Sequence, residues 1–72
     1  MVLRNRLREL RSQQGLTQVS LAEKVGVTRQ TIISVEKGKF VPSVKLALQL
    51  AGTLGTSLEE VFWLDNNKGG EA

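Results

Sequence analysis

The stretch at residues 18–37, QVSLAEKVGVTRQTIISVEK, constrains the fold of this chain more than any other segment. Its apolar residues recur with the spacing of two short amphipathic helices, one on each side of Gly26. Glycine adopts a left-handed backbone without a steric penalty, so Gly26 can end the first helix, and the hydroxyl of Thr28 can cap the second. This layout is typical of a helix-turn-helix. The contacts between the two helices are expected from Leu21, Ala22, Val25, Val27, Ile32 and Val35.

The same segment resembles the helix-turn-helix of the phage repressor and Cro proteins, the XRE family. The matching positions are Gln18, Ala22, Gly26, Ile32, Val35 and the run Glu36-Lys37-Gly38-Lys39. The resemblance continues through LRELRSQQGLTQ before the segment and PSVKLALQLAGTLGTSLEEVF after it, and so covers residues 3–64. It implies an all-α, five-helix repressor-like domain whose third helix enters the DNA major groove.

The rest of the chain is consistent with five helices. Leu3, Leu7 and Leu10 recur at helical spacing, which predicts a first helix that ends near Gln14. The other helices are expected at residues 18–25, 29–37, 44–54 and 58–64, the last with a capping box of Ser57 and Glu60. No segment alternates with the period of a strand, so no strand is expected. Residues 1–64 are predicted to form one domain and residues 65–72 a frayed tail.

Composition excludes several classes of protein. The chain of 72 residues has no cysteine and no histidine, so disulfides, thiolate or imidazole metal sites and histidine-based catalysis are excluded. Its carboxylates are scattered, and we expect neither an enzyme nor a cofactor or small-molecule ligand. No apolar run approaches the length of a membrane span, and the first residues do not resemble a signal peptide. A cytoplasmic protein is expected.

Charge is distributed unevenly along the chain. Residues 1–45 hold nine basic and three acidic residues, whereas residues 46–72 hold one basic and four acidic residues. A basic first part suits a protein that presents one face to a polyanion. An ordinary solvated surface is the alternative that charge alone leaves open.

The exposed face of the helix at residues 29–37 is the candidate DNA-reading surface. If Ile32 and Val35 face the core, the residues that face outward are Arg29, Gln30, Ile33 and Ser34. Arginine can bind guanine, and glutamine adenine, through paired hydrogen bonds, and Ile33 suits a thymine methyl group. The resemblance implies that Arg29, Gln30 and Ser34 contact base edges.

Phosphate contacts are expected around this helix. The helix that begins at Gln18 presents free backbone N–H groups, which suit a phosphate oxygen, although a capping role alone is the alternative for its first residues. The expected phosphate contacts are Arg6, Thr17, Gln18, Thr28, Lys37 and Lys39. Such contacts position the protein and carry little sequence information.

The family resemblance also implies a structural ion pair between Arg11 and Glu36. A bidentate pair of this kind would lock the first helix to the helix-turn-helix. Full solvation of both side chains is the alternative.

The last two helices carry more apolar residues than one helix face requires. We therefore expect a second copy of the chain to cover the excess in a two-fold homodimer, with a compact monomer as the alternative. The expected dimer interface comprises Leu54, Val61, Trp63 and Leu64.

These features together predict a regulator of transcription that binds a palindromic DNA operator as a homodimer and represses by occluding a promoter. The sequence leaves open a phage-type repressor, a restriction–modification controller and an antitoxin. A protein-interaction module that uses the same fold without DNA is the rival from another class.

Overall fold

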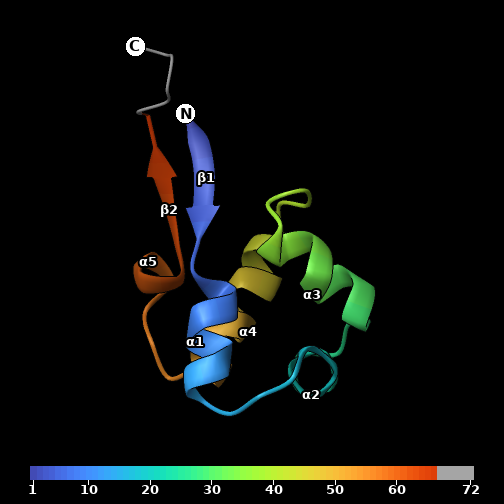
Figure 1. The fold of residues 1–72 in the computed structure, drawn as a ribbon. Helices are drawn as coiled ribbons and strands as arrows, with labels where there is room; N and C mark the ends of the chain where they lie inside the picture. The colour runs from blue at the N-terminus through green and yellow to red at the C-terminus, as the bar shows by residue number, and fades with distance from the viewer. Residues whose placement is uncertain (67–72) are drawn as a thin grey trace.

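The computed structural model describes residues 1–66 (Figure 1). Along this part of the chain the elements are β1 (Val2–Asn5), α1 (Leu7–Gln13), α2 (Gln18–Val25), α3 (Arg29–Glu36), α4 (Val44–Thr53), α5 (Leu58–Val61) and β2 (Phe62–Asp65). The five-helix arrangement is confirmed, and a small terminal sheet is added to it. None of the described helices is long and apolar enough to cross a membrane.

The turn between α2 and α3 has the predicted backbone. Gly26 follows α2 with φ of 75°, which is the left-handed conformation that favours glycine. The hydroxyl of Thr28 accepts a hydrogen bond from the backbone N–H of Thr31 and so caps α3. Thr17 and Ser20 form a reciprocal capping box at the start of α2. Local chemistry therefore fixes both ends of the turn.

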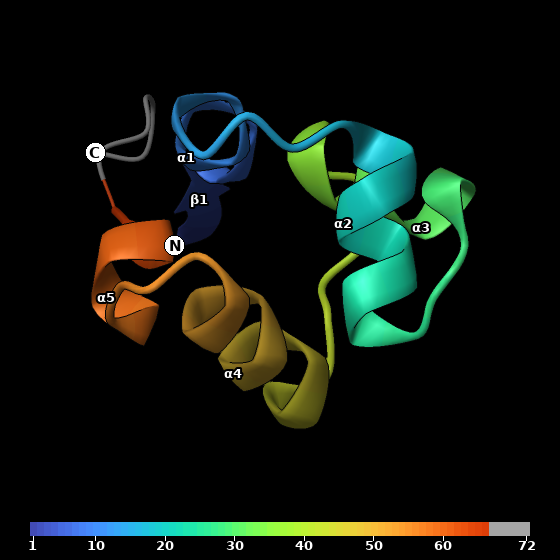
Figure 2. The ribbon, with the colours of Figure 1, turned by 90° about the horizontal axis from the view of Figure 1, so that it is seen from below.

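The helices surround one apolar core. Figure 2 shows α1, α2, α4 and α5 arranged around it, with α3 packed against α2. The most completely buried side chains come from five of the seven elements, and they are Leu7, Leu21, Ile32, Val35, Leu50 and Val61. Because Ile32 and Val35 face this core, α3 has a fixed rotation about its own axis and a fixed outward face.

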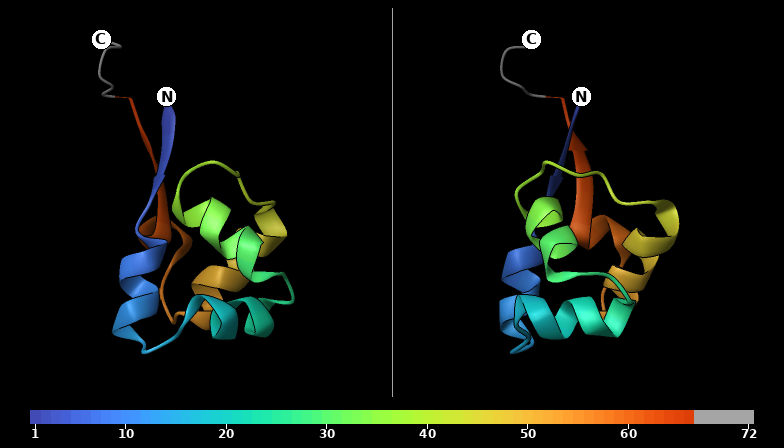
Figure 3. Two further views of the ribbon diagram at one scale, coloured as in Figure 1. Left: turned by 45° about the vertical axis from the view of Figure 1, so that its right-hand side comes forward. Right: turned by 90° about the vertical axis from the view of Figure 1, so that its right-hand side faces the viewer.

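The two ends of the domain differ from the prediction. Residues 2–5 and 62–65 form an antiparallel two-stranded sheet in which Leu3 pairs with Leu64 and Arg4 with Trp63. We expected Leu3 in a helix and the last helix to continue to residue 63 or 64. Instead α5 ends at Val61 because Phe62 takes an extended backbone, with φ of −128° and ψ of 143°. Figures 1 and 3 show the sheet extending from the helical body, with the start of β1 beside the end of β2.

A backbone hydrogen bond fixes the junction between the sheet and the helices. The N–H of Arg6 donates to the carbonyl oxygen of Val61 at 3.0 Å, just before α1 begins. β2 also includes Asp65, the first residue of the expected tail, and residues 67–72 lie outside the described residues.

Candidate nucleic-acid interface

The outward face of α3 carries the four residues predicted to contact bases. In the right-hand view of Figure 3, α3 faces the viewer at the surface of the molecule. Arg29 and Gln30 are exposed at the start of the helix, whereas Ile33 and Ser34 are partly covered. The side-chain amide of Gln30 lies 3.4 Å from the Ser34 hydroxyl. The helix therefore presents a polar end that projects farthest and a less exposed second turn.

Two hollows flank this face of α3. The α1-side hollow has a volume of about 330 Å³ and is lined by Arg8, Arg11, Gln18, Ile33, Glu36 and Lys37. The loop-side hollow has a volume of about 170 Å³ and is lined by Thr28, Gln30, Thr31, Ser34 and Phe40. The exposed face of α3 is therefore a ridge with space on each side. That shape suits a helix lying between two nucleic-acid strands.

The start of α2 borders the α1-side hollow. Its capping box occupies the N–H of Ser20, which donates to the Thr17 hydroxyl at 3.0 Å. The backbone N–H groups of Gln18 and Val19 donate to no group among residues 1–66, so they are available to an anion. The hydroxyls of Thr17 and Thr28 are both engaged within the protein as caps. The structure thus gives these two threonines a capping role.

A hydrogen-bonded network joins three helices beneath the ridge. Arg11 Nε donates to Glu36 Oε2 at 2.7 Å, which is the ion pair that the family resemblance implied. Its Nη1 donates to the carbonyl oxygen of Leu16 at 2.9 Å. The side chains of Arg11 and Glu36 are only 12% and 6% exposed. The pair therefore locks α1 to the last turn of α3.

Gln18 also belongs to this network. Its Nε2 donates to Glu36 Oε1 at 3.1 Å. A carboxylate only accepts hydrogen bonds, so it fixes which end of the Gln18 amide faces it. The side chain of Gln18 is thus held at the edge of the hollow by Glu36.

The basic residues after α3 are free at the surface. Lys37 caps the end of α3, and Lys39 follows in the turn. Both are exposed, and neither forms an ion pair within residues 1–66. Both remain predicted phosphate contacts.

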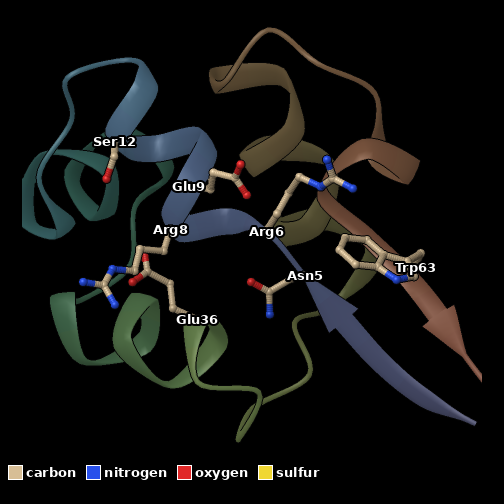
Figure 4. Close-up of a pocket in the computed structure, with 7 residues that line it drawn as sticks. All are labelled: Asn5, Arg6, Arg8, Glu9, Ser12, Glu36 and Trp63. Carbon is tan, nitrogen blue, oxygen red and sulfur yellow. The ribbon is translucent and has the colours of Figure 1, made fainter. Parts of the chain in front are cut away.

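Arg6 has a different environment from the one predicted. Its guanidinium lies 4.9 Å from the centroid of the Trp63 ring. Figure 4 shows this pair on one side of a cavity of about 630 Å³, with Arg8 extending toward α3 on the other. Sequence reasoning selected Arg6 and missed Arg8. The available signal was spacing, because Arg8 lies three residues before Arg11 and therefore shares its helix face.

Comparison with known proteins identifies the family. A helix-turn-helix family model matches residues 7–61, which is most of the chain. The chain belongs to the XRE/Cro-like family of helix-turn-helix transcriptional regulators. The family consists of DNA-binding regulators and not of enzymes. The predicted family and the predicted non-enzymatic class are both confirmed.

Individual relatives cover nearly the whole regulator. It is 52% identical over 66 residues to an uncharacterized HTH-type transcriptional regulator of Methanothermobacter thermautotrophicus, a match that spans 90% of this chain and 96% of the other. It is 46% identical over 63 residues to the uncharacterized HTH-type regulator YgzD of Bacillus subtilis, spanning 88% and 96%. Among solved structures, the restriction–modification controller protein C.AhdI from Aeromonas hydrophila matches with a TM-score of 0.71 and 40% identity, spanning 76% of this chain and 80% of the other.

The regulator also has an apolar surface remote from the ridge. An apolar groove of about 270 Å³ is lined by Leu3, Pro42, Val44, Ala47, Leu58, Phe62, Trp63 and Leu64, with Glu59 at its edge. Val44 is 73% exposed and Leu64 is 62% exposed, so large apolar side chains meet solvent at this groove. In Figure 1, the groove elements α5 and β2 lie on the opposite side of the molecule from α3.

Two of the four residues expected at a dimer interface are buried in the single chain. Leu54 and Val61 are buried within the single chain, because α4 and α5 pack their inner faces together around the core. Trp63 and Leu64 are at the surface, on β2 rather than on a helix. The sequence had left open which of these apolar residues belong to the core and which to an interface, and in the single chain Trp63 and Leu64 are the two at the surface.

Proposed function

We propose that this regulator binds double-stranded DNA in a sequence-specific manner, with α3 in the major groove. The observation that carries the proposal is the ridge of α3, which has exposed Arg29 and Gln30 in its first turn and a hollow on each side. Arg29 suits a guanine and Gln30 an adenine, while Ile33 and Ser34 contact the bases nearer the second turn. Because Ile33 and Ser34 are partly covered, Arg29 and Gln30 in the first turn of α3 discriminate most strongly between base sequences.

The DNA backbone is held at the α1-side hollow and beyond the end of α3. The free N–H groups at the start of α2, beginning with Gln18, receive a phosphate oxygen, and the Gln18 side chain braces this end through Glu36. Lys37 and Lys39 contact phosphates beyond the end of α3. Thr17 and Thr28 act indirectly, because their hydroxyls hold the two helix starts in position.

The regulator acts as a homodimer that uses the apolar groove as its interface. The groove offers both halves of an apolar contact. Ala47 and Phe62 are buried at the groove, and the exposed side chains of Val44 and Leu64 can pack onto the same residues of a second copy. Covering it with a second copy around a two-fold axis leaves the α3 ridge of each copy free. Two ridges about 34–36 Å apart then match a palindromic operator.

Repression by occlusion of a promoter follows from this mode of binding, since a dimer seated across a promoter excludes the polymerase. Such a protein acts in the cytoplasm, where its DNA lies. A second candidate role is control of restriction–modification genes, which the 40% identity to C.AhdI favours. Both roles use the same DNA-binding surface and differ only in the genes that the operator controls.

Selection of binding sites from random double-stranded DNA by the purified protein tests the proposal. The expected product is a palindromic consensus whose half-sites are one helical turn apart. Selected sequences that bind no tighter than random DNA would refute sequence-specific recognition. A consensus without two-fold symmetry would leave DNA recognition intact and refute the homodimer.

A further inference from the structure

The α1-side hollow is lined by a basic side chain, Arg8, that neither the sequence nor the resemblance singled out. Arg8 extends from α1 into the same hollow as Ile33 and Lys37 of α3. It is exposed, and it forms no ion pair or hydrogen bond with any other side chain of residues 1–66. A cation without an internal partner, placed beside the ridge, is free to meet an external anion.

The other charges of the hollow do not oppose such an anion. Glu36 supplies the one carboxylate, but Arg11 neutralises it at 2.7 Å and its side chain is 6% exposed. Gln18 uses one of its amide donors on Glu36 and keeps a second donor. Arg8 and Lys37 therefore set the charge that the mouth of the hollow presents.

Arg6 and Arg8 differ in their neighbours although they are two residues apart. Figure 4 shows Arg6 turned over the Trp63 ring, while Arg8 reaches toward α3. A helix that enters the major groove has a phosphate backbone along each flank, so the hollow beside α3 that Arg8 lines meets one of the two strands. Both arginines line the cavity of Figure 4, but only Arg8 also lines the α1-side hollow beside α3.

We propose that the α1-side hollow receives one backbone phosphate of the operator, held between Arg8 and Lys37, so that Arg8 is the backbone contact of α1 and Arg6 is not. This assignment rests on the proposed function, since it requires that α3 lie in the major groove. Arg8 thereby extends the DNA contact from the helix-turn-helix to the first helix. A guanidinium at this point also restricts how far the ridge can tilt in the groove.

The test compares the salt dependence of DNA affinity for Arg8→Ala, Arg8→Lys and Arg6→Ala with that of the wild type. Each phosphate contact that is lost reduces the slope of log K against log salt by about 0.9. Arg8→Ala should reduce the slope by about this amount on both the selected operator and an unrelated duplex. Arg8→Lys should keep the wild-type slope because it keeps the charge, and Arg6→Ala should also keep it. Arg8 has no internal partner, so the thermal unfolding midpoint of Arg8→Ala should match that of the wild type.

Neutral methylphosphonate substitutions, placed one at a time along the operator, locate the phosphate. At one position per half-site the wild type should lose affinity, and Arg8→Ala should lose less at that position, because only the contact from Lys37 remains to be lost. An unchanged slope for Arg8→Ala, or a reduced slope for Arg6→Ala, would overturn the assignment while leaving DNA recognition by α3 in place. Failure of the wild type to bind any duplex would overturn the proposed function and this inference together.

Discussion

The side-chain amide of Asn5 donates a hydrogen bond to the backbone carbonyl oxygen of Val35, 3.0 Å away in the last turn of α3. The Oδ1 atom of the same side chain accepts from the N–H of Leu7 at 3.0 Å and so caps the start of α1. Asn5 is the last residue of β1. One partly buried side chain therefore ties the terminal sheet to α1 and to the helix that carries the DNA-reading face.

Replacement of Asn5 by alanine should lower the free energy of unfolding by about 1–3 kcal/mol, because it leaves the N–H of Leu7 without its partner and removes one of the hydrogen bonds to the Val35 carbonyl oxygen, which also accepts from the N–H of Gly38. Urea denaturation measures the loss. Asn5→Asp is the matched control: it keeps the capping acceptor, removes the donor to Val35, and should lose less than Asn5→Ala. Equal stability of Asn5→Ala and the wild type would contradict the linking role.

The contrast between the centre and the ends of the domain explains what the sequence could predict. The α2–α3 unit depends on interactions within a few residues, such as the left-handed turn at Gly26 and the cap at Thr28, and these were predicted correctly. The terminal sheet pairs Leu3 with Leu64, which no local pattern can indicate. The leucine spacing at Leu3 fitted a helix equally well, and pairing across the whole chain decided the outcome.

The candidate site was predictable to a similar extent. Face assignments on α3 followed from helical periodicity once Ile32 and Val35 were assigned to the core. The environment of Arg6 depends on Trp63, and the bond between Gln18 and Glu36 depends on how α2 meets α3. Both are tertiary contacts between residues far apart in the sequence, so no local pattern of residues specifies them.

Loss of one partner of the Arg11–Glu36 ion pair should strongly destabilise the fold. Arg11→Met leaves the nearly buried Glu36 carboxylate with only the Gln18 amide, and we expect it to cost about 3–5 kcal/mol of stability. The double variant Arg11→Met/Glu36→Met should be less destabilised than the sum of the single variants, since it removes the stranded charge as well. Denaturant unfolding of the four proteins gives the coupling between Arg11 and Glu36, and strictly additive losses would show that the two side chains do not stabilise each other.

Arg29 should contribute specificity rather than general affinity. Arg29→Ala is expected to weaken binding to the selected operator by about 1–3 kcal/mol and to have little effect on an unrelated duplex. Fluorescence anisotropy on both duplexes measures the difference. Equal losses on the two would reassign Arg29 to the phosphate backbone.

Lys39 should behave in the opposite way. Lys39→Ala should weaken both duplexes alike and lower the salt slope by about one unit, because a phosphate contact carries no sequence information. Lys24→Ala on the exposed face of α2 is a matched control, since it removes the same charge from a residue outside both hollows. A salt slope that stays constant in Lys39→Ala would place Lys39 outside the interface.

The start of α5 should respond to acid. The hydrogen bond from the Thr56 hydroxyl, followed by that from the Ser57 backbone N–H, lowers the pKa of Glu60 below its ordinary value of 4.5. Because the folded-state pKa is the lower one, this carboxylate stabilises the fold above its unfolded pKa, and the contribution is lost as pH falls through the folded pKa. Thr56→Val should raise the pKa of Glu60 toward 4.5 in a carboxyl NMR titration. The opposite shift, or none, would show that the Ser57 N–H alone holds the carboxylate.

The apolar groove provides the most direct test of assembly. Val44→Asp places a charge on a side chain that is 73% exposed in the single chain, so the monomer fold should survive, and an acidic residue is compatible with the first turn of α4. In a dimer the same charge would be desolvated without a partner, so sedimentation should show a shift toward monomer and operator binding should require a higher protein concentration.

The control is Val19→Asp, because Val19 is a half-exposed valine on α2 outside the groove. This variant should leave the oligomeric state unchanged. Wild-type protein that sediments as a monomer at high concentration, or a Val44→Asp variant that remains as dimeric as the wild type, would exclude this groove as the interface between copies.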